Sequence, residues 1–212
     1  TWGKVMDDQS SLSEGKYQNM FNIRNDWSRS SYDIQHAFKI GYVYDLPVGK
    51  GRAFGANMNS LANAILGGWA LEGIVQLQSG VASNLRTGVD RANVGKTNER
   101  PNLLRAPMLP KGQRTVDRWF DTSAVVMPDQ YTWGNSGAYV LTDDGRAIWD
   151  LSIAKRFHFM ERHSLEVRGE FFNFPNHPDF GSPGTTLGTT SFGVISGATS
   201  PRNVQIALRY AF

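Results

Sequence analysis

Few side chains in this sequence are spaced in a way that could do chemistry. Residues 94–97, Val-Gly-Lys-Thr, have the spacing of the end of a phosphate-binding loop. That motif needs glycine at position 90, where the sequence has Asp90, and no strand-then-helix pattern flanks it. The acidic pairs Asp7-Asp8 and Asp143-Asp144 are explained as turn formers, because aspartate hydrogen-bonds to its own backbone.

The histidines and the cysteine count also give no catalytic or metal-binding pattern. His36, His158, His163 and His177 lack the spacing of metal ligands such as His-Glu-x-x-His. The chain has no cysteine, which excludes disulfides, thiolate metal sites and cysteine nucleophiles. No catalytic triad is recognisable. We therefore expect no enzyme activity, no cofactor and no metal site.

Composition bounds the fold class. The 212 residues include 22 Gly, 12 Phe, 7 Tyr and 6 Trp, a mixture that argues against disorder and favours strands and turns. A net charge of only +3 gives no reason to expect a nucleic-acid partner. The first residues show no signal peptide, and no stretch is typical of a spanning helix. Mean hydropathy is −0.38, but strands of a membrane barrel alternate lipid-facing and lumen-facing residues and average out in such values.

Six segments alternate apolar and polar residues with a period of two, which is typical of strands with one apolar face. The clearest is residues 202–212. The others are residues 1–6, a strand entered partway along, and residues 34–46, 69–78, 149–157 and 165–172. The sequence therefore predicts an all-β chain of antiparallel, up-and-down strands.

The connections between these segments mostly alternate in length. Residues 7–33, 79–145 and 175–201 are long, residues 159–162 form a tight turn, and residues 47–67, of moderate length, are the exception. Outer-membrane barrels have short periplasmic turns and long extracellular loops. With the tight turn in the periplasm, the chain ends at the periplasmic side and the three long connections lie outside. This favours a transmembrane β-barrel of the outer membrane, in contact with its lipid.

The polar faces of the strands would line a wetted lumen. Strands that neighbour one another carry charges of both signs, so cross-strand charge pairs are expected. The charged residues expected to face the lumen are Asp150, Arg156, Glu166, Arg168, Glu170 and Arg209.

The apolar faces carry aromatic side chains near the strand ends, as in interfacial girdles. They are Tyr44, Trp69, Phe157, Tyr210 and Phe212 at one end, and Phe38, Trp149 and Phe171 at the other. Lys155 interrupts one apolar face, and we expect it to snorkel to the interface. The alternative is a soluble β-sandwich in which the same apolar faces form a core; it would fold without detergent.

Short segments in a characteristic order run through nearly the whole chain. They are Thr1-Trp2-Gly3-Lys4, Tyr42-Val43-Tyr44-Asp45-Leu46-Pro47, Trp149-Asp150-Leu151-Ser152, Glu170-Phe171-Phe172-Asn173 and Asn176-His177-Pro178-Asp179-Phe180-Gly181, with shorter matches at 7–8, 33–36, 49–52, 67–69, 78–80, 100–102 and 118–120. In order and spacing they resemble the C-terminal end of a TonB-dependent transporter barrel of the Oar-like type, which often follows a carboxypeptidase-regulatory-like domain. Phe174-Pro175 departs from the family pattern, which has a small residue and then an aromatic.

The resemblance implies that residues 1–212 are the C-terminal portion of this barrel. A signal peptide, a plug, a TonB-contacting segment and the first strands would lie upstream. The last strand resembles the signal read by the barrel assembly machinery, because apolar residues alternate up to a terminal aromatic: Val204, Ile206, Leu208, Tyr210 and Phe212. An ordinary edge strand of a soluble sheet is the alternative, although such edges are usually blunted by charge or proline.

Two functions are compatible with this reading. In the first, the barrel takes up a solute when an energised TonB-type partner displaces the plug. Exposure and chemistry suggest these loop residues as solute contacts: Arg91, Lys96, Arg100, Trp119, Tyr131 and Trp133. In the second, the barrel is structural or adhesive and presents its loops to extracellular partners. Uptake that depends on the inner-membrane partner would separate the two.

Overall fold

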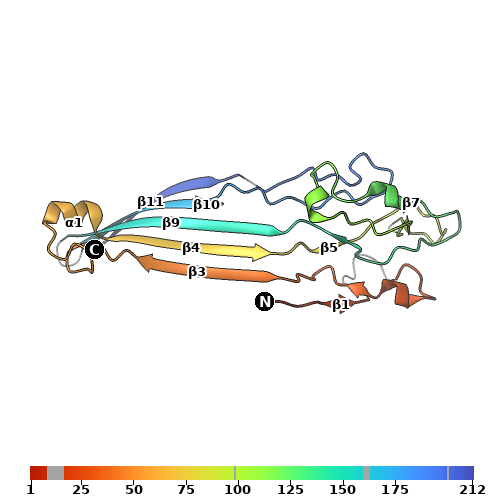
Figure 1. Ribbon diagram of the computed structural model, residues 1–212, viewed down its shortest axis with the longest axis horizontal. Coiled ribbons are helices and arrows are strands. Elements are labelled where there is room, and N and C mark those ends of the chain that lie inside the picture. The colour runs from red at the N-terminus through yellow and green to blue at the C-terminus, as the bar shows by residue number, and fades with distance from the viewer. Residues whose placement is uncertain (9–16, 98, 160–162, 200) are drawn as a thin grey trace. The chain divides into compact units, whose positions relative to one another are not determined.

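The computed structural model describes residues 1–8, 17–97, 99–159, 163–199 and 201–212 (Figure 1). It divides into two compact units. The strand unit comprises Phe38–Leu77, Ala147–Pro178 and Ser200–Phe212. The loop unit comprises Thr1–Ala37, Gln78–Arg146 and Asp179–Thr199.

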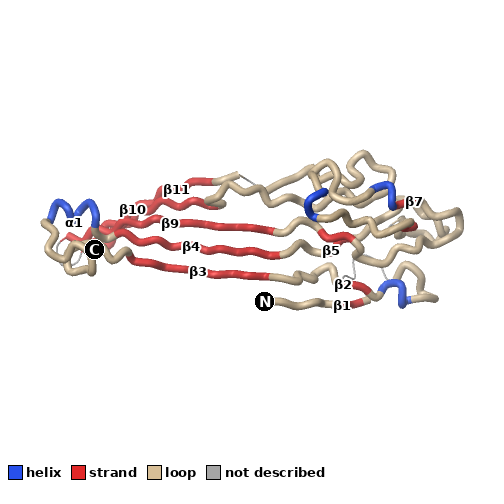
Figure 2. The backbone as a smooth tube through the Cα atoms, in the orientation of Figure 1, coloured by secondary structure: helices blue, strands red, loops and turns tan. Residues whose placement is uncertain are grey.

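A five-stranded sheet dominates the strand unit. Its strands are β3 (Ala37–Asp45), β4 (Trp69–Gln78), β9 (Arg146–Phe159), β10 (His163–Phe172) and β11 (Asn203–Ala211). Their order across the sheet is β11-β10-β9-β4-β3 (Figures 1 and 2). Among these five strands, neighbours in the sheet are therefore also consecutive along the chain. The sheet is therefore an up-and-down arrangement, as the alternation predicts.

The pairing is antiparallel throughout. Glu166 of β10 lies opposite Arg156 of β9 and Arg209 of β11. The Leu46 N–H donates to the Trp69 carbonyl, and the Ser79 N–H donates to the His36 carbonyl, so β3 and β4 also run in opposite directions. This register places every second residue on the same face of the sheet.

One face of the sheet is apolar and uncovered by the described chain. On β11, Ile206 is 80% exposed and Leu208 is 69% exposed. Tyr42 lies over Gly73, where an added Cβ would come within 2.5 Å of the tyrosine hydroxyl. The Trp149 Nε1–H donates to that hydroxyl at 3.0 Å. The polar end of the tyrosine is thus satisfied within an apolar surface.

The predicted strands agree with the observed ones except at their ends. Residues 69–78 coincide with β4, residues 34–46 shorten to β3, and residues 149–157 lengthen to β9. The predicted tight turn at 159–162 includes residues 160–162, which lie outside the described residues. Parts of the long connections 7–33, 79–145 and 175–201 also lie outside them.

The predicted first strand, residues 1–6, is only partly regular. Trp2 forms an isolated bridge with His36, and β1 (Met6–Asp7) pairs with β2 (Ser28–Arg29). Between these two points the Val5 N–H donates to the buried Asp33 carboxylate at 2.8 Å. The expectation of a continuous strand is wrong because a side chain here replaces a backbone acceptor.

The connection between β3 and β4, for which the sequence predicts no helix, contains one. α1 (Ser60–Leu66) begins after Asn59, whose side chain accepts the Ala62 N–H at 2.8 Å. In the described part of the chain, no helix has both the length and the apolar character needed to span a membrane.

The loop unit has a hydrophobic core of its own. It consists of Leu85, Trp119, Phe120, Val125, Leu141 and Ile195. Around it lie short elements: η2 (Ile23–Asp26), β5 (Ala82–Ser83), β6 (Asn102–Leu103), η3 (Lys111–Gln113), η4 (Thr122–Ala124), β7 (Val125–Val126) and β8 (Leu141–Thr142). β5 pairs with β8, and β6 pairs with β7. The long connections are therefore folded together rather than being independent loops.

Candidate functional site: a charged ladder on the sheet

Six charged side chains on the polar face of the sheet form a connected ladder. They are Asp45, Glu72, Arg156, Glu166, Arg168 and Glu170, and they come from β3, β4, β9 and β10. Because alternate residues share a face, Glu166, Arg168 and Glu170 line up along β10. We call this set the charged ladder.

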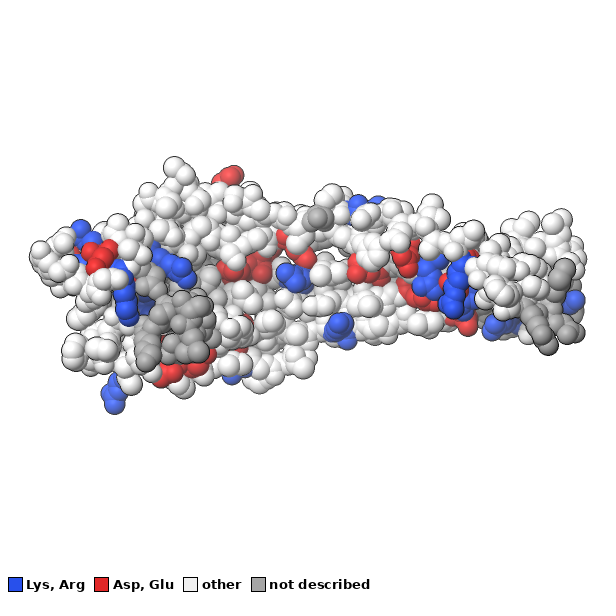
Figure 3. Space-filling model, turned by 180° about the vertical axis from the view of Figure 1, so that it is seen from behind, with Lys and Arg blue, Asp and Glu red and all other residues white. Residues whose placement is uncertain are grey.

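Two arginines hold the ladder together. Arg156 contacts Glu166 at 2.7 Å, Glu72 at 3.2 Å and Asp45 at 3.7 Å. Arg168 contacts Glu166 at 2.8 Å, Glu72 at 3.4 Å and Glu170 at 3.7 Å. Figure 3 shows acidic and basic side chains against one another on this face. With four carboxylates around two guanidinium groups, the ladder keeps an excess of negative charge.

The structure brings together four of the six residues predicted to face the lumen. Asp150 is not part of the ladder, since its carboxylate accepts the Asn173 N–H at 2.8 Å. Arg209 lies opposite Glu166 in register, but it makes no ion pair among the described residues. Sequence reasoning missed Glu72 and Asp45, although the polar alternation of Glu72 with Gln76 and Gln78 was a usable signal.

Two of the proposed loop contacts are buried, so the exposure expected for them is wrong. Arg100 is 7% exposed, and its guanidinium contacts Asp26 at 2.5 Å and the Ser136 carbonyl at 2.9 Å. Trp119 is also 7% exposed, and its Nε1–H donates to the Thr142 carbonyl at 2.9 Å. Both side chains are committed to the interior of the loop unit.

The other four proposed contacts are more accessible. Tyr131 is 71% exposed and Trp133 is 37% exposed. Arg91 and Lys96 are half-buried; Arg91 donates to the Pro128 carbonyl at 2.9 Å, and Lys96 donates to the Tyr17 carbonyl at 3.2 Å. A solute contact at these four residues stays a prediction.

The turn around residues 90–95 is closed by a carboxylate. Asp90 accepts the Val94 N–H at 3.0 Å and the Gly95 N–H at 2.7 Å, and the first of these bonds is the main cause that lowers its pKa. These are backbone donors that a phosphate loop would need to direct at its ligand. The backbone N–H groups of Val94 and Gly95 are therefore bonded to Asp90 and are not directed at a phosphate ligand.

A second carboxylate, Glu99, packs behind this turn. It is 3% exposed and accepts the backbone N–H groups of Arg91 and Ala92. Burial is the main cause that raises the pKa of Glu99 above its ordinary value. Across the described residues, no three His, Asp or Glu side chains are grouped to hold a metal ion.

Four residues of the proposed assembly signal lie on the apolar face of β11, and the fifth, Phe212, directly follows the strand. Val204, Ile206, Leu208, Tyr210 and Phe212 are all more than half exposed. At the strand end, the Tyr210 hydroxyl lies 2.6 Å from Nδ1 of His163, and the two rings stack. This cluster of rings occupies the place expected of an aromatic girdle.

Lys155, which is expected to snorkel to the interface, extends toward the end of α1. It is 5% exposed, and its ammonium lies 5.2 Å from the ring centroid of Trp69 and 5.1 Å from that of Phe157. It also donates to the Ile65 and Gly67 carbonyls at the end of α1. Helix carbonyls and two aromatic rings thus satisfy the charge locally.

Residues 1–205 match a family model described as an outer membrane beta barrel domain. Neither the curated proteins nor the solved structures give a significant match to the chain.

Proposed function

The chain belongs to the outer membrane beta barrel domain family and lies in the outer membrane, and from this premise we propose that it forms part of the wall of a TonB-dependent transporter. The transporter takes up a solute through its lumen. Its partners are the surrounding lipid, the barrel assembly machinery, which reads β11, a TonB-type energising complex and the solute. The proposal gives the chain no catalytic role and no nucleic-acid partner.

The charged ladder is the observation that carries this proposal. Neighbouring strands present an uncovered apolar face on one side and fixed charges of both signs on the other. That asymmetry suits a wall between lipid and a wetted lumen. Charged side chains fixed by several partners keep their positions when a plug moves or a solute passes. The order and spacing of the TonB-type segments support the specific class of transporter.

One observation favours the second candidate, a structural or adhesive barrel. The loop unit has its own hydrophobic core, and two of the six proposed solute contacts are buried in it. A preformed loop surface of this kind suits the display of a binding face to an extracellular partner.

Solute depletion from a defined medium tests the transport proposal. We compare the wild-type strain with strains lacking the complete gene or its inner-membrane energising partner, and measure the remaining solutes by mass spectrometry. Transport predicts that the same solute stays in the medium in both deletion strains. Identical depletion in all three strains would contradict transport and leave the adhesive role.

A further inference from the structure

Three apolar side chains interrupt the polar face of the sheet. Val43, Ile74 and Phe172 are each two positions from a ladder residue of the same strand, so they share the face of the charged ladder. Val43 is 75% exposed, Ile74 is 46% exposed and Phe172 is 43% exposed. Ion pairing does not account for them, and exposing apolar surface to a wetted lumen is unfavourable.

These three side chains belong to the lining of a cavity of about 380 Å³ in the strand unit. β3, β4, β9 and β10 each contribute three consecutive residues to it: 41–43, 72–74, 150–152 and 170–172. The outer two residues of each triplet place their side chains on the polar face. Of the neighbouring side chains on the opposite face, Leu71, Val75 and Ile153 do not line it. The cavity therefore opens on the polar face.

The charged part of the lining is acidic. It contains Glu72, Asp150 and Glu170, and none of the described residues that line the cavity is a lysine, arginine or histidine. Arg168 contacts Glu72 and Glu170, whereas Arg156 contacts Glu72 and is shared with carboxylates outside the lining. The lining therefore keeps an excess of negative charge beside its apolar side chains.

Gly41 leaves space in this cavity. Glycine inside a strand weakens it and often marks a place where a ligand or another backbone approaches closely. Beyond its chain neighbours, a Cβ added at Gly41 would meet one described atom within 4 Å, the Gly73 carbonyl oxygen at 3.9 Å. No described backbone packs closely against Gly41, which favours the ligand.

We propose that this cavity is a subsite on the lumen wall for a solute that joins a cationic group to an apolar group. The cation, an ammonium or a guanidinium, lies against the three carboxylates, and the apolar group lies against the three apolar side chains. Concave, mainly apolar surfaces with a few placed charges are the usual form of small-molecule sites. That the bound molecule is the solute taken up rests on the proposed transport function, whereas binding itself does not.

Three probes of similar shape test the proposal on the purified complete protein in lipid nanodiscs. They are phenylbutylammonium, the anion phenylbutyrate and the uncharged phenylbutanol. Ligand-detected NMR measures their binding, with empty nanodiscs as the blank. We expect the ammonium to bind most tightly and the carboxylate not to bind. Ammonium binding no tighter than that of the other two probes would overturn the proposal, as would no binding, the result expected if another part of the protein fills the cavity.

Gly41→Leu tests the location, because it places a side chain in the cavity without changing its charge. We expect it to abolish binding of phenylbutylammonium. Gly169→Leu is the matched control on the apolar face, where an added Cβ would make only ordinary contacts with the Phe171 ring, the nearest at 3.6 Å. The control should bind like the wild type. Unchanged binding by Gly41→Leu would overturn the site.

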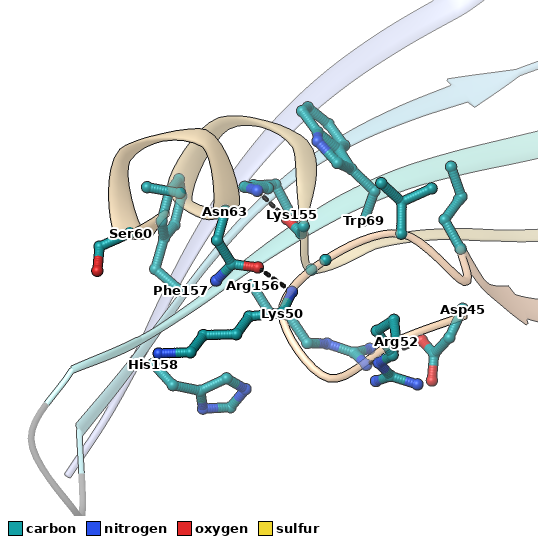
Figure 4. Close-up of a pocket in the computed structure, with 16 residues that line it drawn as sticks. Asp45, Lys50, Arg52, Ser60, Asn63, Trp69, Lys155, Arg156, Phe157 and His158 are labelled. Atoms are coloured by element: carbon teal, nitrogen blue, oxygen red, sulfur yellow. Dashed lines mark hydrogen bonds and ion pairs between the residues drawn. The ribbon is translucent and has the colours of Figure 1, made fainter. Parts of the chain in front are cut away.

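Glu170→Gln tests the charge. We expect it to weaken binding of phenylbutylammonium about fivefold, because one of the three carboxylates is neutralised. Asp45→Asn is the matched control, since Asp45 and Glu170 each contact a ladder arginine at 3.7 Å. Asp45 lies at a separate cavity, whose lining includes Lys50 and Arg52 (Figure 4). Equal loss of binding in both variants would overturn a role for the lining carboxylates.

Cross-linking of the wild type tests the site without any variant. A diazirine derivative of phenylbutylammonium should label the four triplets, and labelling confined to the loop unit would contradict the site. The outcomes also separate binding from transport. Binding that Gly41→Leu abolishes, together with identical depletion in the wild-type and deletion strains, would support the cavity and refute transport. Partner-dependent depletion without binding of the ammonium probe would support transport and refute the proposed class of solute.

Discussion

Arg156 lies within ion-pair distance of carboxylates from three different strands, β3, β4 and β10. Its side chain is 38% exposed, so solvent screens each contact, and single exposed pairs contribute only about 0.2–1 kcal/mol. What distinguishes Arg156 is the number of partners, because removing it deprives Asp45 of its ion pair and leaves Arg168 as the guanidinium that Glu72 and Glu166 share.

We predict that Arg156→Met lowers the free energy of unfolding of the complete protein by about 1 kcal/mol. Urea unfolding in lipid vesicles measures the change. Arg209→Met is the matched control, because Arg209 has no ion pair in the described residues, and it should change stability by less than about 0.5 kcal/mol. Equal effects of the two variants would show that the ion pairs of Arg156 do not contribute to the free energy of unfolding.

Asp121 gives the loop unit a pH dependence. Hydrogen bonding to Ser123 is the main cause that lowers the pKa of Asp121, followed by hydrogen bonding to Arg105, which contacts it at 2.6 Å. A lowered folded-state pKa means that the stabilisation is present above the unfolded pKa of about 4 and is lost as pH falls through the folded-state pKa.

Asp121→Asn should therefore speed hydrogen exchange at residues 103–124 at pH 7, after correction for intrinsic rates. Below the folded-state pKa, the variant and the wild type should open to the same extent. Asp117→Asn serves as control, since Asp117 lies in the same segment without a hydrogen bond from another described residue. A difference between Asp121→Asn and wild type that persists unchanged in acid would contradict the assigned role of the charge.

At the scale of elements, strands could be predicted because their signal is local. The alternation of residues 69–78 between the glycines at 67–68 and the loop after Gln78 is sufficient to define β4. α1 could not be predicted as readily, because it is only seven residues long and depends on Trp69 and Lys155. The Asn59 cap was the available local signal.

The site was predictable only where neighbouring strands in the sheet are also neighbours in sequence. Arg156 and Glu166 pair across one hairpin, so the sequence indicated their contact. The contact of Glu72 with Arg168 depends on where β4 lies relative to β10, which no local pattern specifies. The burial of Arg100 and Trp119 likewise depends on contacts from distant segments, such as Asp26 and Thr142.

The proposed role of β11 in assembly predicts a strong effect at the end of the chain. Phe212 is 90% exposed and stacks on Tyr210. Phe212→Ala should give a several-fold drop in the amount of complete protein folded in the outer membrane, measured in isolated membranes, because the terminal aromatic of the signal is lost. Ala211→Ser, on the opposite face, should be assembled normally. Normal assembly of both variants would refute a signal at this residue.

At the scale of the whole molecule, two compact units with separate interiors should respond separately to mutation. Phe120 is fully buried in the core of the loop unit, where it contacts Phe192 edge to face at 5.2 Å between ring centroids. Phe120→Ala should destabilise this unit by about 3–5 kcal/mol and raise its hydrogen exchange, with little change at residues 147–159. Phe21→Ala, at a residue 87% exposed, is the control. Faster exchange throughout both units would contradict their independence.

One face of the sheet should lie in lipid and the other should be in contact with water. Because this chain has no cysteine, single cysteines can be placed along β11 and tested in the complete protein in outer-membrane vesicles with a water-soluble maleimide. We expect labelling to alternate, high at 205, 207 and 209 and low at 204, 206 and 208. Equal labelling at all six positions, or higher labelling on the apolar side, would contradict it.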